Sequence, residues 1–215
     1  MTVMINEIFY SIQGESSYAG RPCLFVRLTG CNLRCSYCDT RYAYEEGTRM
    51  EIEAILDRLS VYDCPLVEIT GGEPLAQEET PYLVSRLLEK DYQVLMETNG
   101  SQDISRVDSR CVRIVDIKCP LSGEADKNDL ENLERLTEND EVKFVISGRE
   151  DYEYAREILN RVPLPLPRID RIHFSPAFGR MEYGELAKWI LDDHLKVRLH
   201  LQLHKIIWKP DLRGV

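Results

Sequence analysis

The sequence predicts an α/β fold: an incomplete, TIM-like barrel of about six mostly parallel strands with few outer helices. Strand-like apolar runs alternate with amphipathic, helix-like runs along the chain, a rhythm typical of parallel sheets. The 215 residues suffice for one barrel-like unit, and no linker, low-complexity tract or repeat divides them. We therefore expect residues 1–215 to form a single domain. Some connections, such as 103–111, are too short for an outer helix, which argues against a full eightfold barrel.

Each expected strand is a short apolar run that ends in glycine, proline or polar residues. The first, residues 23–30, reads CLFVRLTG, and the second, residues 65–72, reads PLVEITGG. The remaining expected strands follow in chain order at residues 92–100, 112–120, 141–147, 169–176 and 195–202.

Each expected helix has apolar residues at helical spacing. In residues 51–59 one face carries all the large aliphatic side chains, Ile52, Ile55, Leu56 and Leu59. The further expected helices are residues 77–90, 128–136, 150–162 and 182–193.

Polar or glycine-bearing segments stand at the C-terminal tips of five expected strands: TGC, TGGEP, ETNG, DIKCP and HFSP. In parallel α/β sheets, ligands gather at this edge. The five tips therefore predict one shared binding site.

The composition excludes some classes of protein. The 37 acidic and 27 basic residues give a net charge of −10, which argues against a general binder of nucleic acid or of anionic membranes. No apolar stretch approaches the roughly 20 residues that span a bilayer. The first residues have no basic region ahead of an apolar one, so no signal peptide is expected. These features predict a cytoplasmic protein with no membrane or nucleic-acid partner, whose thiols are reduced, metal-bound or catalytic.

Three of the seven cysteines, Cys31, Cys35 and Cys38, fall within the segment TGCNLRCSYCDT, residues 29–40. Thiolates bind soft metals, either zinc or the iron of iron–sulfur clusters. A structural zinc site usually has four ligands, whereas a 4Fe–4S cluster held by three cysteines keeps one iron open for a small molecule. No histidine lies within fifty residues of this loop.

The other cysteines leave an alternative open. The three-cysteine loop could instead be half of a zinc knuckle that Cys64, Cys111 or Cys119 completes. The chain would then be a zinc-bound structural module. We expect Cys23, Cys64 and Cys111 to be small core residues, since cysteine is commonly buried. Cys119, beside a strand tip, fits either reading.

The loop CNLRCSYCDT, with the aromatic Tyr37 before its last cysteine, resembles the CxxxCxxC loop of radical S-adenosylmethionine (SAM) enzymes. TGGEP, residues 70–74, resembles the glycine-rich strand with which that superfamily contacts the cofactor. The resemblance implies a 4Fe–4S cluster whose open iron is chelated by S-adenosylmethionine, and a radical formed on that cofactor that abstracts hydrogen from the substrate.

A narrower resemblance covers nearly the whole chain. EIFYSIQGES, GRPCLFVRLTGCNLRC, CDT, ETNG, DIKCP, FSP and QLHKIIW together resemble the 7-carboxy-7-deazaguanine synthase family. This implies a lyase of queuosine biosynthesis that contracts the ring of 6-carboxy-5,6,7,8-tetrahydropterin with loss of ammonia. It further implies a magnesium ion, a homodimer, and an electron donor such as flavodoxin or ferredoxin. The alternative within the superfamily is a small activating enzyme that installs a glycyl radical on a partner.

Four polar residues have an ordinary structural interpretation beside the role that the resemblance implies. Arg27 lies inside an apolar strand and needs a partner, either a structural ion pair or the carboxylate of the substrate. In the turn SIQGES, an ordinary loop or a pterin site, Gln13 and Glu15 suit the donor–acceptor edge of a pterin. Thr40 either belongs to an Asx-type turn or supplies an oxygen to magnesium.

The resemblance assigns the remaining roles, and it assigns no side chain as catalytic because the radical is on the cofactor. For the substrate it implies Ile12, Gln13, Gly14, Glu15, Arg27, Thr70, His204 and Pro210. For S-adenosylmethionine it implies Tyr37, Asp39, Gly72, Glu73, Asn99, Lys118, Ser175 and Pro176. For metals it implies Cys31, Cys35 and Cys38 at the cluster and Thr40 at magnesium. His173, on an apolar strand, is expected to be a packed core residue.

Overall fold

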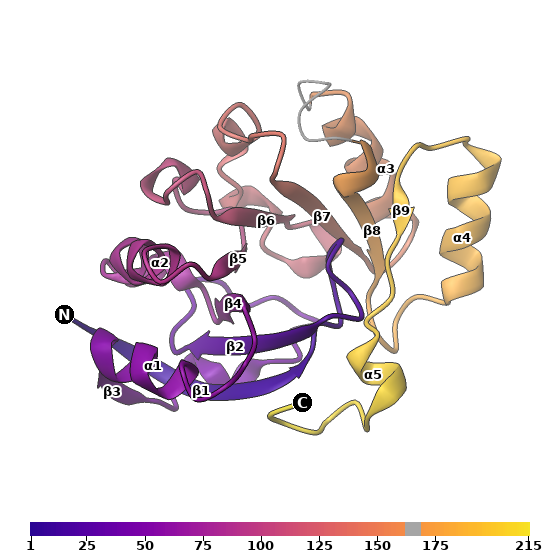
Figure 1. Ribbon diagram of the computed structural model, residues 1–215. Coiled ribbons are helices and arrows are strands. Elements are labelled where there is room, and N and C mark those ends of the chain that lie inside the picture. The colour runs from indigo at the N-terminus through magenta and orange to yellow at the C-terminus, as the bar shows by residue number, and fades with distance from the viewer. Residues whose placement is uncertain (162–168) are drawn as a thin grey trace.

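In the residues that the structure describes, 1–161 and 169–215, nine strands form one sheet in the order β3-β1-β2-β4-β5-β6-β7-β8-β9 (Figure 1). The structure is a computed structural model. The strands from β2 to β9 are parallel, and they are β2 (Pro22–Leu28), β4 (Leu66–Gly71), β5 (Gln93–Thr98), β6 (Val112–Ile117), β7 (Glu141–Ile146), β8 (Ile172–Pro176) and β9 (Arg198–Leu199). Two antiparallel strands, β1 (Thr2–Ile12) and β3 (Thr48–Glu51), extend the sheet beyond β2.

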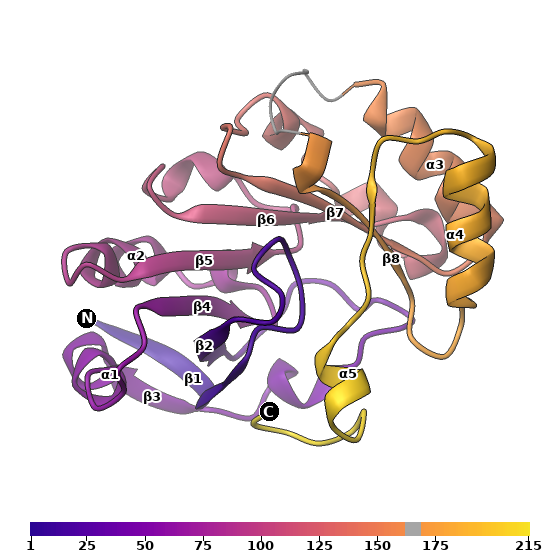
Figure 2. The same cartoon turned by 45° about the vertical axis from the view of Figure 1, so that its right-hand side comes forward.

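The sheet is curved but not closed, because β3 and β9 are its two edges. Figures 1 and 2 show its strands fanning around a common centre, with helices α1 to α4 on the outer side and α5 near the C-terminus. The helices are α1 (Ile52–Leu59), α2 (Thr80–Leu88), α3 (Arg149–Leu159), α4 (Tyr183–Asp192) and α5 (His204–Ile207). The predicted partial barrel of mostly parallel strands with few helices is confirmed.

The outer layer is apolar, as the helical periodicity predicted. The four aliphatic side chains expected on one face of residues 51–59 are all buried in α1. Burial of such side chains contributes roughly 1.5–3 kcal/mol each, which is why an eight-residue helix is stable on the sheet. Cys23, Cys64 and Cys111 lie in this core as expected, and Cys119 joins them.

Several element predictions need correction. Residues 2–12 form strand β1, although no strand is expected there from the sequence and its end is expected to be a turn. Strand β3 and helix α5 were not predicted either. Of the predicted strand 195–202, only Arg198 and Leu199 pair in the sheet, since this edge position has no further neighbour.

The predicted helix 128–136 is instead a short 3₁₀ turn over Leu130–Leu133. The buried Asn132 causes the change, because its Nδ2 donates to the carbonyls of Gly100 (3.1 Å) and Gln102 (2.8 Å). Such side-chain bonds to distant backbone compete with a regular helix. The last residue of the predicted helix 150–162 lies outside the described residues.

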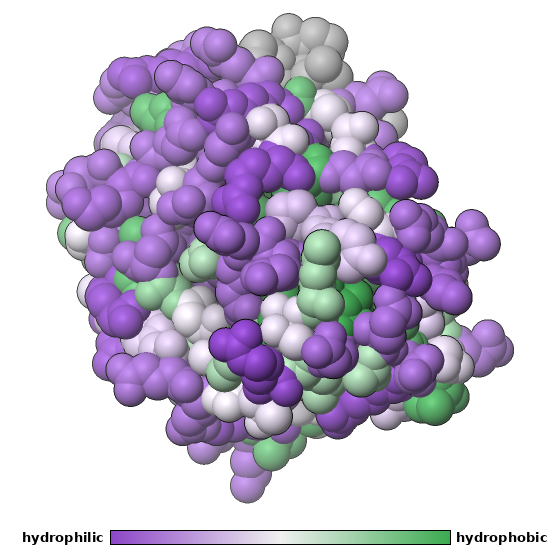
Figure 3. Space-filling view, turned by 90° about the vertical axis from the view of Figure 1, so that its left-hand side faces the viewer, coloured by the Kyte–Doolittle hydropathy of each residue, from purple (hydrophilic) through white to green (hydrophobic). Residues whose placement is uncertain are grey.

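Within the described residues, no helix is both long and apolar enough to cross a membrane. The face shown in Figure 3 is mostly hydrophilic, with small separate apolar areas.

Candidate active site

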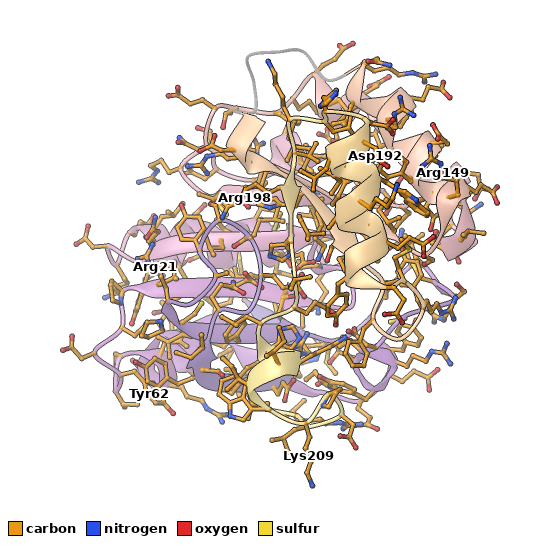
Figure 4. All side chains as sticks on the ribbon, turned by 90° about the vertical axis from the view of Figure 1, so that its right-hand side faces the viewer. Arg21, Tyr62, Arg149, Asp192, Arg198 and Lys209 are labelled. Carbon is orange, nitrogen blue, oxygen red and sulfur yellow. The ribbon has the colours of Figure 1, made fainter. Side chains whose placement is uncertain are left out.

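The C-terminal ends of the parallel strands surround a cavity of about 320 Å³. Every site residue named from the sequence lines this cavity except Glu73. The strand tips of β2, β4, β5, β6 and β8 all contribute, as the arrangement of parallel strands predicted. Figure 4 looks onto β9 and α4; α5 lies below β9, and Lys209 follows it pointing outward. The C-terminal segment after Lys209 also lines the cavity, from Pro210 to Val215.

The cysteine loop follows β2 and is tied to its surroundings by backbone bonds. Ser36 N donates to the carbonyl of Ser122 (2.9 Å), and Cys38 N donates to the carbonyl of Cys35 (3.2 Å). The thiols of Cys31, Cys35 and Cys38 are free, half-buried, and line the cavity together. Burial raises the pKa of Cys35 to about 11, so binding a metal here would release protons.

The glycine-rich tip of β4 lies directly against this loop. A Cβ atom on Gly72 would fall 1.9 Å from the carbonyl oxygen of Gly30 and 3.0 Å from Cβ of Cys31. Gly71 has a φ of +144°, a conformation that side chains rarely allow. Only glycine therefore lets the two segments approach, and the N–H of Glu73 then donates to Gly30 O at 2.7 Å.

Glu73 does not take the position expected for a cofactor contact. Its carboxylate is fully buried and accepts hydrogen bonds from Leu75 N (2.9 Å), Thr98 Oγ1 (2.8 Å) and Asn99 N (2.6 Å). Burial raises the pKa of this carboxyl group. Glu73 thus joins the tips of β4 and β5 and shapes the ETNG turn from behind the cavity wall.

Asn99 connects the same turn to the cysteine loop. Its Nδ2 donates to Asn32 Oδ1 at 3.0 Å and lies 3.8 Å from the sulfur of Cys31. Tyr37, Ser175, Pro176 and Lys118 surround the same part of the cavity. The Lys118 Nζ donates to Asp116 Oδ2 at 2.8 Å.

Residues 12–15, Arg27, Thr40 and α5 also line the cavity. Thr40 Oγ1 donates to Asp39 Oδ1 at 2.9 Å, and Asp39 also forms an ion pair with Lys205 of α5. Gly14 allows α5 to dock, because a Cβ there would lie 2.2 Å from His204 Nδ1. Burial lowers the pKa of His204, which favours its neutral form.

Four charged residues of the cavity floor were missed: Glu68, Glu97, Asp116 and Lys143. Lys143 forms ion pairs with Glu15 (2.7 Å), Glu97 and, more distantly, Asp116 (3.9 Å). Burial opposes the charged form of Lys143, but these carboxylates outweigh it and hold its pKa well above the usual value. Likewise burial opposes ionisation of Glu15, but Lys143, His200 and His204 together outweigh it and hold the pKa of Glu15 well below normal.

Glu68 behaves differently from Glu15, although both are buried. It accepts a hydrogen bond from Gln13 Nε2, and burial, with Glu97 and Glu15 nearby, raises its pKa well above normal. All four missed residues are charges inside apolar expected strands. The rule that singled out Arg27 would have found them.

His173 is packed in the core, as expected, with Nε2 2.7 Å from Glu141 Oε2. It does not line the cavity.

The arrangement defines a class of enzyme. A three-cysteine loop meets a glycine strand tip beside an open polar cavity, at the C-terminal edge of a partial barrel. The sequence model of the Radical SAM superfamily matches residues 25–115, which span both segments. The chain is thus a radical SAM protein.

Comparison with related proteins identifies the family within this superfamily. The chain is 47% identical to 7-carboxy-7-deazaguanine synthase of Koribacter versatilis, over 99% of this chain and 100% of the relative. It is 48% identical to the enzyme of the same name from Chlorobaculum tepidum, over 98% of this chain and 96% of the relative. The chain belongs to the 7-carboxy-7-deazaguanine synthase family.

A solved structure agrees on the fold. The crystal structure of QueE from Escherichia coli superposes with a TM-score of 0.74, covering 95% of each chain at 23% identity. At that identity the likeness concerns the fold alone. The crystal structure of Streptococcus suis SuiB bound to precursor peptide SuiA superposes with a TM-score of 0.58, covering 80% of this chain and 46% of that chain.

The residues present fit an iron–sulfur cluster better than zinc. The thiols that would complete a zinc knuckle, Cys64, Cys111 and Cys119, are all buried in the apolar core. Three accessible thiols beside a cavity and a glycine cradle instead suit a wider cluster with one open metal.

Proposed function

We propose that this chain converts 6-carboxy-5,6,7,8-tetrahydropterin into 7-carboxy-7-deazaguanine with loss of ammonia, a step of queuosine biosynthesis. The observation that supports the proposal is one shared cavity of about 320 Å³, which is lined by the three thiols together with the amide of Gln13, the carboxylate of Glu15 and the guanidinium of Arg27. Identity of 47% over 99% of the chain supports it further.

The cofactor end of the cavity is assigned to Cys31, Cys35 and Cys38 for a 4Fe–4S cluster, with S-adenosylmethionine against Gly72. When bound, this group supplies a radical that removes a hydrogen atom from the substrate. The protein's part is orientation and exclusion of water. We assign that part to side chains around the loop, namely Tyr37, Asp39, Asn99, Lys118, Ser175 and Pro176.

The substrate end is assigned by charge and hydrogen-bonding capacity. Lys143 keeps Glu15 ionised, so Glu15 can accept from the N–H groups of the pterin edge. Gln202 Nε2 donates to Glu15 Oε1 at 2.8 Å and fixes the carboxylate in place. Arg27 is assigned to the substrate carboxylate and Thr40 to a magnesium ion beside it. Ile12, Gln13, Gly14, Thr70, His204 and Pro210 enclose the ring.

The wider context is proposed in the same terms. We infer a single-domain, cytoplasmic enzyme that works as a homodimer without nucleic-acid or membrane partners. An electron donor such as flavodoxin or ferredoxin would reduce the cluster. The net charge of −10 suits a small-molecule enzyme.

The test is anaerobic purification, reconstitution and assay. The protein should be brown with about four irons per chain. With reductant, S-adenosylmethionine and the tetrahydropterin, it should release the deazapurine, identified by mass. A colourless protein that carries zinc, or a brown protein that cleaves S-adenosylmethionine without yielding the deazapurine, would refute the proposal; the second outcome would favour an activating enzyme.

A further inference from the structure

Arg27 and Glu7 face each other across β1 and β2 because of a β-bulge. The register of the two strands shifts between Ile5 and Glu7, and Glu7 then pairs with Arg27. Without the extra residue, Glu7 would oppose Val26 and point to the other face of the sheet. Bulges commonly re-aim a side chain next to an active site.

One carboxylate oxygen of Glu7 receives two donors. Arg27 Nε donates to Glu7 Oε1 at 2.7 Å, and Tyr42 Oη donates to the same oxygen at 3.1 Å. Burial raises the pKa of Tyr42 to about 12, so its hydroxyl remains a neutral donor at ordinary pH. Arg27 and Tyr42 line the cavity, whereas Glu7 does not. Glu7 therefore acts on Arg27 from behind.

The rest of the Arg27 guanidinium is oriented but not engaged. Its carbon lies 5.8 Å from the ring centre of Phe9 and 5.9 Å from that of Tyr42. Beyond the bond from Nε, the guanidinium makes no hydrogen bond to a described residue. A guanidinium has five N–H donors in a planar fork, so the edge that carries the two Nη groups keeps its full capacity for a carboxylate.

We propose that Glu7 and Tyr42 are positioning residues that hold Arg27 by its Nε edge and thereby present its two Nη groups to the carboxylate of the substrate. The inference rests on the proposed function, which supplies a carboxylated pterin. It deepens that function by assigning the selectivity for a carboxylate to a half-buried trio, of which only Arg27 touches the ligand.

Two effects of Glu7 oppose each other, and variants separate them. Its charge partly neutralises Arg27 and so weakens attraction for an anion, while its hydrogen bond fixes the guanidinium. Glu7→Ala removes both effects. Glu7→Gln removes only the charge, because the amide oxygen still accepts from Arg27 and Tyr42. If positioning dominates, Ala impairs recognition and Gln restores it.

The experiment titrates reconstituted protein, with S-adenosylmethionine and magnesium, against 6-carboxypterin and 6-methylpterin. The ratio of the two dissociation constants measures preference for the carboxylate. Glu7→Ala is expected to reduce this preference about tenfold, the size expected for one hydrogen bond to a charged group. Glu7→Gln should keep the preference of the unaltered protein or exceed it, because it keeps the hydrogen bond and removes the opposing charge, and Tyr42→Phe should lose about threefold. A purely structural role would weaken both pterins equally and leave the ratio unchanged.

The matched control is Glu53→Ala, which removes the carboxylate of another Glu–Arg pair, Glu53–Arg86, outside the cavity. Its ratio should not change. If Glu7→Ala keeps the full preference while Arg27→Lys loses it, the positioning inference is wrong and the role of Arg27 stands. If the unaltered protein prefers neither pterin yet turns over the tetrahydropterin, the roles proposed for Arg27 and for Glu7 are both wrong. Absence of binding and of turnover together would refute the proposed function itself.

Discussion

The two faces of the central sheet carry opposite kinds of side chain. Along β7, Val142 and Phe144 are buried in the apolar core, while Lys143 between them lines the cavity. The same alternation places Glu68 of β4 and Asp116 of β6 on the cavity side. One strand thus serves both stability and chemistry, because successive side chains point to opposite faces. The outer face is stabilised by packing, whereas the inner face depends on mutual pairing of its charges.

The largest loss of stability is expected from a substitution on the outer face of the sheet. Phe174 packs edge to face on Phe144 (5.5 Å between ring centres) and on Tyr152 of α3 (5.8 Å). Phe174→Ala should lower the free energy of unfolding by about 3–5 kcal/mol. Turnover per folded molecule should persist, since Phe174 does not line the cavity. Anaerobic urea unfolding measures the first quantity; a loss below about 1 kcal/mol would show that the outer face does not dominate stability.

On the inner face, removal of the central cation, Lys143, should also lower the free energy of unfolding. Lys143→Met leaves Glu15, Glu97 and Asp116 facing one another, which should cost about 3 kcal/mol at neutral pH. In the variant the pKa of Glu15, which Lys143 helps to hold down, should rise, so Glu15 takes up a proton in the folded state as the pH falls from about 7 to 5, and the deficit should narrow. In the unaltered protein the depressed pKa of Glu15 keeps its contribution over the same range.

The control for this change is Lys188→Met, which removes an exposed lysine paired with Asp192 on α4. Its stability should change little and without pH dependence. A pH-independent deficit in Lys143→Met would mean that the three carboxylates are not coupled through Lys143.

His200 provides a test of burial through the pH dependence of the free energy of unfolding. It is buried, and neither of its ring nitrogens has a hydrogen-bond partner among the described residues. Burial lowers its pKa to about 4. His173 and Lys143 add to this shift, whereas Glu15 and Glu141 oppose it. The unfolded chain binds a proton near pH 6.5, so the stability from neutral His200 is present above that pH and is lost as the pH falls toward 4. About 2 kcal/mol should disappear between pH 7.5 and 5. His200→Gln should remove this component.

The exposed His194 provides the comparison, and His194→Asn should keep the acid-induced loss of the unaltered protein. Equal pH profiles for the unaltered protein and His200→Gln would show that His200 carries a proton in the folded state.

The smallest effect is expected at the solvent-exposed surface. Arg161 pairs with Glu157 one turn away on the rim of α3, with both side chains more than half exposed. Arg161→Ala should change the free energy of unfolding by less than about 0.5 kcal/mol, since solvent screens such pairs. A larger change would show that an exposed ion pair can stabilise the protein as the charges inside the barrel do.

Part of the active site could be predicted from the sequence because its signals are local. The cysteine loop, the glycine tip TGGEP and the polar ends of five strands each stand within a few residues. Parallel strands bring such tips to one edge, and the structure gathers them around one cavity. Glu73 departs from this pattern because three donors from neighbouring segments claim its carboxylate.

The sequence by itself determined the parallel strands from β2 to β8, helices α1 to α4, the three-cysteine loop and the family, since periodicity and motif spacing are properties of short segments. Only the tertiary structure decided which charges meet. Lys143 reaches Glu15 across 128 positions of sequence, and the bulge in β1 turns Glu7 toward Arg27. Such pairs depend on strand register and on the closure of the sheet around its centre, because the energy of a buried charge is set by neighbours that only folding brings within a few ångströms.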